Sequence, residues 1–170
     1  SSNLFEIAES VERVHAVSED GHYALCESGL SDLCMLDIRQ QKMIYLLTRI
    51  RESSGGIMGS FLGDGDRFVL VFGRGEITLM NTADGNVMRT QDTKMEIAGM
   101  CLLAGNDDYV LTVGGKTLRL WDMQKGAFVF AFPVHHADIG SLCVNSTGTE
   151  VFAIDECGVI CHWILDWEYE

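Results

Sequence analysis

The sequence predicts an all-β fold, because four passages of short apolar runs, separated by glycine and aspartate turns, repeat about every forty residues. One series of equivalent positions runs Tyr23, Phe68, Tyr109 and Val151, with spacings of 45, 41 and 42 residues. A second series runs Leu36, Met80, Trp121 and Trp163, with spacings of 44, 41 and 42 residues. Two series with nearly matching steps indicate one repeated supersecondary unit, and a repeat of this length is typical of a β-propeller blade.

The third repeat shows the expected unit most clearly. Residues 98–103, 109–113, 117–121 and 127–132 form four apolar runs, which we name strands a, b, c and d. Turn residues separate the runs: Asn106 and Asp107, then Gly114 and Gly115, then Lys125 and Gly126. The pattern predicts a four-stranded antiparallel sheet in which each strand pairs with its neighbour in sequence.

The same template divides the chain into blades at approximately 9–50, 51–93, 94–135 and 136–170, within a single propeller segment. The fourth repeat has room for strands a, b and c only. The run Leu4-Phe5-Glu6-Ile7-Ala8 has the character of a strand and precedes the first strand a, where a strand d is expected. We therefore expect one terminus to complete the sheet begun by the other, which removes an open sheet edge.

Composition sets limits on the class of protein. Hydrophobic residues make up 47% of the 170 residues, which is enough to fill a core. The net charge of −13 argues against direct binding to nucleic acid or to an anionic membrane. The six cysteines mostly fall in apolar strands, where a free thiol packs as a small hydrophobe, and this favours a reducing cytoplasmic location.

The residues that close strand c carry a family resemblance. The segment Thr117-Leu118-Arg119-Leu120-Trp121-Asp122 ends on Trp-Asp, and Gly158-Val159-Ile160-Cys161-His162-Trp163 ends on tryptophan. With His136 entering the next strand a, these segments resemble the WD-repeat (WD40) family over essentially the whole chain. The first two repeats are degenerate, with Leu36-Asp37 and Met80-Asn81 at the Trp-Asp position. The segment Trp163-Ile164-Leu165-Asp166-Trp167-Glu168-Tyr169 also resembles the last repeat of bacterial signalling proteins that carry WD repeats behind kinase or NTPase domains.

The resemblance implies a buried hydrogen-bond set of histidine, serine or threonine, aspartate and tryptophan in each blade. The fourth repeat comes closest, with His136, Asp155 and Trp163 at the expected positions. The third has Thr112 and Trp121 but glycines where the aspartate is expected. We therefore expect blade stability to come mainly from apolar packing.

Four blades are half of the eight that many rings of this family contain. We expect the chain to be half of an eight-bladed ring, either paired with a second copy through a two-fold axis or belonging to a longer protein with further blades. In a paired ring, residues 4–8 of one copy complete the last blade of the other.

No pattern in the chain points to catalysis, a cofactor or a metal. Cys157, Cys161 and His162 form the only Cys/His cluster in the sequence, and they supply too few ligands for zinc. Each aspartate-rich or glycine-rich segment already has a turn position in the repeat that explains it. We therefore expect a protein that is not an enzyme.

The expected function is a protein-protein interaction scaffold, by resemblance to the family. The candidate surface comprises the d–a connections 51–56, 90–96 and 133–138 and the b–c turns beside them. The residues predicted to contact a protein partner are Arg51, Glu52, Arg74, Lys116, His135 and Glu156. Trp121, Asp122, His136, Asp155 and Trp163 are expected to be structural. The negative net charge favours a partner with a basic or mixed surface. The alternatives are a small-molecule sensor that uses the central channel, and an enzyme whose catalytic residues lie on other blades.

Overall fold

The computed structural model describes residues 11–28, 32–47, 56–63, 65–103, 109–132 and 135–166. Within these ranges the protein is all-β and contains no helix, so no helix there is able to cross a membrane. Sheet 1 comprises β1 (Val11–Val17), β2 (Tyr23–Ser28), β3 (Leu33–Asp37) and β4 (Lys42–Leu47), and sheet 2 comprises β5 (Ile57–Phe61), β6 (Arg67–Phe72), β7 (Glu76–Asn81) and β8 (Val87–Asp92). Sheet 3 comprises β9 (Gly99–Leu102), β10 (Tyr109–Gly114), β11 (Thr117–Asp122) and β12 (Ala127–Ala131), and sheet 4 comprises β13 (Ile139–Val144), β14 (Glu150–Asp155) and β15 (Ile160–Ile164).

Every sheet is an antiparallel meander in which strands pair in chain order. The prediction of an all-β fold with four successive sheets is confirmed, and the strand limits given for the third repeat agree with the structure to within about one residue. The prediction that the fourth repeat supplies three strands also holds for the described residues. The run at residues 4–8 lies outside the described residues.

The residue that ends the third strand holds the turn that follows. Asp37 Oδ1 accepts the Gln40 backbone N–H at 2.7 Å, and Asp122 Oδ1 accepts the Lys125 backbone N–H at 2.8 Å. In sheet 2 the equivalent Asn81 Oδ1 accepts an N–H from Ala83 at 2.8 Å. Asp and Asn stabilise turns in this way because their short side chains reach backbone groups two or three residues ahead. The Trp-Asp position therefore has a local physical role in three of the described sheets.

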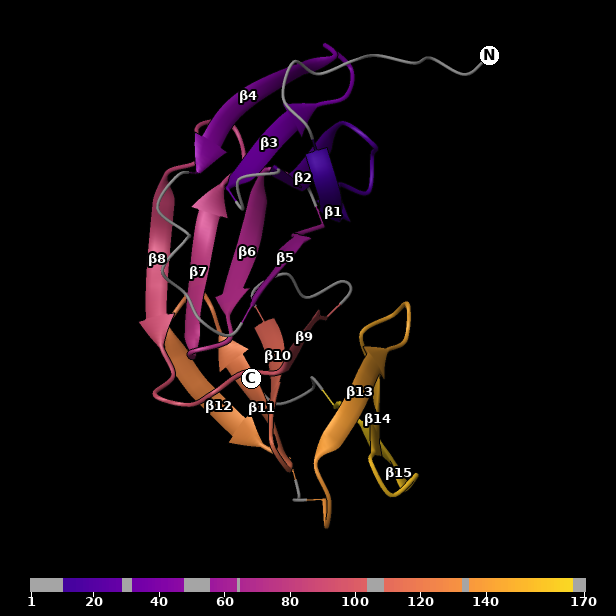
Figure 1. The fold of residues 1–170 in the computed structure, drawn as a ribbon. Helices are drawn as coiled ribbons and strands as arrows, with labels where there is room; N and C mark the ends of the chain where they lie inside the picture. Colours follow the sequence, from indigo (N-terminus) through magenta and orange to yellow (C-terminus); the bar gives the residue numbers. More distant parts are fainter. Residues whose placement is uncertain are drawn as a thin grey trace, which may run out of the picture.

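The four sheets follow one another along an open arc (Figure 1). Their first strands are neighbours: β1 contacts β5, β5 contacts β9, and β9 contacts β13. The fourth strands β4, β8 and β12 lie on the outer side of the arc. The described residues form no closed ring, so the eight-bladed arrangement remains a prediction.

The core lies between the faces of consecutive sheets. Because side chains alternate along a strand, Phe68 and Leu70 of β6 pack toward sheet 1, whereas Val69 and Val71 pack toward sheet 3. Leu111 and Val151 belong to a third cluster, between sheets 3 and 4. The middle strands of sheets 2 and 3 are thus covered on both faces, which accounts for their unbroken apolar runs.

Candidate functional site

The turns between second and third strands, which we call the b–c turns, meet the linkers that join one sheet to the next. In sheet 2 the linker residue Ile97 donates its backbone N–H to the Gly73 carbonyl oxygen at 2.9 Å. Thr93 donates both its backbone N–H, at 2.8 Å, and its hydroxyl, at 2.7 Å, to the Gly75 carbonyl oxygen. These bonds fix the linker against the b–c turn of sheet 2.

The next linker is held in the same way between sheets 3 and 4. The backbone N–H of His135 donates to the Lys116 carbonyl oxygen at 3.1 Å, and that of Ile139 donates to the Gly115 carbonyl oxygen at 2.9 Å. On its other side, the Asp138 carbonyl oxygen accepts the Glu156 backbone N–H at 2.9 Å. The b–c turns of sheets 2, 3 and 4 and the described parts of the two linkers between these sheets therefore form one continuous end of the molecule.

Two glycines permit this close approach. Gly75 has φ +111°, a conformation that L residues rarely adopt, and a Cβ there would overlap the Met95 carbonyl oxygen. A Cβ on Gly114 would overlap the carbonyl oxygen of Glu96. One linker is thus packed against the b–c turns of two different sheets.

A cavity of about 680 Å³ opens at this end of the molecule. Gly73 and Arg74 of sheet 2, the linker residues Glu96 to Ala98, the turn of sheet 3 and Asp138 line it. Its charged groups are one guanidinium and two carboxylates, and the exposed side chains of Lys116 and Glu156 lie on the adjoining turns. A lining of this kind suits a partner that presents both signs of charge.

The structure places the predicted contact residues in three groups. Arg74, Lys116 and Glu156 are exposed on b–c turns, as predicted. Arg51 and Glu52 lie outside the described residues. The prediction for His135 is wrong, because this residue is 4% exposed and does not face solvent. Glu96 and Asp138 were missed as individual residues, although both fall within linkers that the sequence singled out.

The structural histidine of the fourth repeat is His135, and the prediction of His136 is off by one residue. His135 Nδ1 lies 3.3 Å from Asp155 Oδ2, both side chains are 1% exposed, and the His135 and Trp163 ring centroids are 5.8 Å apart. His136 is exposed. The bond from His135 N–H to the Lys116 carbonyl oxygen sets the register of the linker, and in this register the side chain of His135 faces Asp155.

Asp155 also holds its own b–c turn. Its Oδ1 accepts the backbone N–H of Val159 at 2.9 Å and that of Cys157 at 3.0 Å. The hydrogen bond from Val159, supported by those from His135 and Cys157, lowers the pKa of the Asp155 carboxyl. Asp155 is therefore a structural residue, as predicted.

Of the expected set of histidine, serine or threonine, aspartate and tryptophan, sheet 3 contains the threonine and the tryptophan. Trp121 Nε1–H donates to Thr112 Oγ1 at 2.7 Å in the core. Trp121 pairs across the sheet with Val110, and Trp163 of sheet 4 pairs in the same way with Val151. Two residues after these partners, sheet 3 has Thr112, whereas sheet 4 has Ala153. Neither sheet has all four polar members.

No protein-family model matches the chain, and neither does any curated protein. The WD-repeat resemblance thus depends on the residues and hydrogen bonds described above.

The remaining candidate chemistry is limited. None of the six cysteines forms a disulfide bond, and Cys157 is exposed. Cys161 Sγ lies 3.9 Å from His135 Nδ1, inside the sheet 3–sheet 4 interface. No group of three or more His, Cys, Asp or Glu side chains that could hold a metal occurs within the described ranges.

Proposed function

We propose that this chain is a segment of a WD-repeat β-propeller and acts as a non-catalytic protein-protein interaction scaffold. The observation that carries the proposal is the continuous end formed by b–c turns and linkers, with its cavity of about 680 Å³ beside Arg74, Glu96 and Asp138. Loops held by a rigid sheet scaffold are common sites of binding. The repeat, the inner position of the first strands and the partial polar sets support the propeller assignment.

The partner is a protein with a mixed or basic surface. The chain has a net charge of −13, while the candidate end combines Arg74 and Lys116 with Glu96, Asp138 and Glu156. Arrangements of both charge signs favour one register of docking over others. We also propose a reducing cytoplasmic location, which the placement of most cysteines in apolar strands favours.

Site-specific photo-crosslinking tests this proposal. A photoreactive amino acid is introduced at Lys116, on the candidate end, or at Lys125, an exposed residue on the c–d turn at the opposite end of the same sheet. We expect discrete crosslinked partners from position 116 only, and we expect Arg74→Glu to reduce them strongly. Equal labelling from both positions, or labelling unaffected by Arg74→Glu, would rule out this surface.

We also propose that the chain self-associates into a closed ring. Among the described strands β15 pairs only with β14, so its other edge is open. A groove of about 700 Å³ lies at this strand, lined by Phe130 and Phe132 of sheet 3 and by Trp163 and Ile164 of β15. A strand from the 4–8 run of a second copy would pair with this edge and cover the groove.

A further inference from the structure

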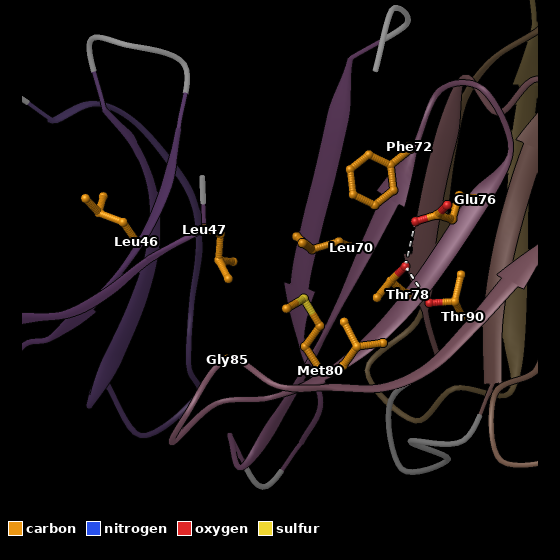
Figure 2. A pocket seen from close by; sticks show the side chains of 10 residues that line it. Leu46, Leu47, Leu70, Phe72, Glu76, Thr78, Met80, Gly85 and Thr90 are labelled. Atoms are coloured by element: carbon orange, nitrogen blue, oxygen red, sulfur yellow. Dashed lines mark hydrogen bonds between the residues drawn. The ribbon is translucent and has the colours of Figure 1, made fainter. Parts of the chain in front are cut away.

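A separate cavity lies between sheets 1 and 2, and its lining shares no residue with the lining of the cavity at the candidate end (Figure 2). Its volume is about 410 Å³, within the range of sites that hold a small group or a few side chains. Leu46 and Leu47 of β4 lie on one side, and Leu70, Phe72 and Met80 of sheet 2 lie on the other. The packing of Tyr45 against Gly85, with its hydroxyl donating to the Thr82 carbonyl oxygen at 2.8 Å, closes one end.

The sheet 2 wall also carries a chain of polar groups that face the cavity. Thr78 and Thr90 are cross-strand partners, and their hydroxyl oxygens are 3.4 Å apart. Thr78 Oγ1 donates to Glu76 Oε1 at 3.0 Å. Because a hydroxyl has one hydrogen, the Thr78–Thr90 bond must be donated by Thr90. The hydroxyl hydrogens of Thr78 and Thr90 are then both engaged. These polar groups therefore present only hydrogen-bond acceptors to the cavity, namely hydroxyl lone pairs and the Glu76 carboxylate.

The charge at this wall is negative. Glu76 is the cross-strand partner of Asp92, but the Asp92 carboxylate is paired with Lys94. Glu76 forms no ion pair with any residue that the structure describes. A group that enters the cavity and donates hydrogen bonds to Glu76 and Thr90 would therefore be favoured if it carried a positive charge.

The mouth of the cavity is flanked by two sheet edges. Within the described part of the chain, β4 pairs only with β3, and β8 pairs only with β7. Edge strands present unpaired backbone N–H and C=O groups, which bind extended peptides by strand addition. This arrangement suits a peptide segment better than a free small molecule.

We propose that this cavity binds an extended segment of a protein partner in which arginine or lysine stands two residues after an apolar residue, so that both side chains lie on the same face of the segment. The apolar side chain packs against Leu70, Phe72 and Met80, and the basic side chain donates to Glu76 and Thr90. The site goes beyond the proposed scaffold surface and does not depend on it.

NMR of ¹³C-methyl-methionine protein tests the proposal, since Met80 lines the cavity and Met123, buried between sheets 2 and 3, serves as an internal reference. The probe is the N-acetylated, C-amidated tetrapeptide Leu-Ala-Arg-Ala, whose leucine and arginine lie on one face when the peptide is extended. We expect a saturable shift of the Met80 resonance without a shift of Met123. Glu76→Gln should weaken binding roughly fivefold, the value of one partly exposed charge pair. The matched control Glu19→Gln, in an exposed turn, should leave binding unchanged.

Three results would overturn the proposal. The first is a Met80 resonance that does not respond to the peptide. The second is equal binding of Leu-Ala-Glu-Ala, or of the parent peptide to Glu76→Gln, because either would remove the role of charge. The third is equal affinity for n-pentylguanidinium alone, which would assign the cavity to small cations instead of a peptide.

Discussion

His135 is bound through one ring nitrogen and leaves the other unpaired. Nδ1 faces Asp155, while the buried Nε2 has no hydrogen-bond partner. The position that carries a hydroxyl in sheet 3, at Thr112, is Ala153 in sheet 4. Ala153 is the cross-strand partner of Cys161, whose sulfur lies 3.9 Å from the same imidazole. Sheet 4 therefore lacks a hydroxyl at the position where sheet 3 has one.

Ala153→Ser should stabilise the protein, because we expect the new hydroxyl to form a hydrogen bond with the unpaired His135 Nε2. A satisfied hydrogen bond in a buried site contributes about 1 kcal/mol. Urea unfolding monitored by tryptophan fluorescence measures the gain. The control is Ala24→Ser, at another buried alanine, which should be neutral or destabilising. Equal responses of the two variants would show that the orphaned nitrogen is not the cause.

Several carboxylates make the fold sensitive to acid. The pKa of Asp155 is lowered, chiefly by the Val159 N–H, that of Asp37 chiefly by the Gln40 N–H, and that of Asp20 chiefly by the Ser18 hydroxyl. A carboxyl whose folded pKa lies below its unfolded value of about 3.9 stabilises the fold above that value. The stabilisation is lost as the pH falls through the folded pKa.

The urea midpoint should therefore fall between about pH 5 and about pH 3. Asp155→Asn should lower the midpoint at pH 5 and show a smaller further drop at pH 3, because one of the titrating groups is gone. Unfolding curves at the two pH values provide the comparison. A drop of the same size in parent and variant would contradict the assigned role of Asp155.

The linkers and b–c turns depend on glycine for two different reasons. Gly75 needs both a positive φ and the absence of a Cβ, whereas Gly21 has φ +67° with no atom within 4 Å of a Cβ. Gly21→Ala should therefore cost about 1 kcal/mol, from backbone strain alone.

Gly75→Ala should cost clearly more than Gly21→Ala, because the added methyl also displaces the linker at Met95. The displaced linker carries Glu96 and Ile97, so the candidate end should lose crosslinking from position 116 while Gly21→Ala retains it. Thermal unfolding and the crosslinking yield measure the two effects. Equal destabilisation by the two variants would show that the linker contact is unimportant.

The strands of this fold could be predicted from sequence, because the alternation of apolar and polar residues and the turn residues between strands are patterns of neighbouring residues. The role of Asp122 in its turn is also local, since its partner is three residues away. The choice between His135 and His136 was not local: it depends on a hydrogen bond to Lys116, in a different sheet segment. Likewise, the spacing of Glu76 and Thr78 places them on one face, but only packing brings Leu46 and Leu47 opposite to them.

The arc of four sheets ends on an apolar face. Ile154, Ile160 and Ile164 of sheet 4 are 39%, 66% and 74% exposed, whereas the faces between consecutive sheets are buried. Exposed apolar patches of this kind, beside an open strand edge, mark surfaces that associate with another chain. A two-fold ring would cover this face and the edge of β15 in one step.

Light scattering of the purified chain over a concentration series tests this arrangement most directly. We predict a mass of about twice the 18.8 kDa of one chain, as expected for two half-rings joined in a closed ring. A mass that stays at 18.8 kDa at all concentrations would contradict the paired ring.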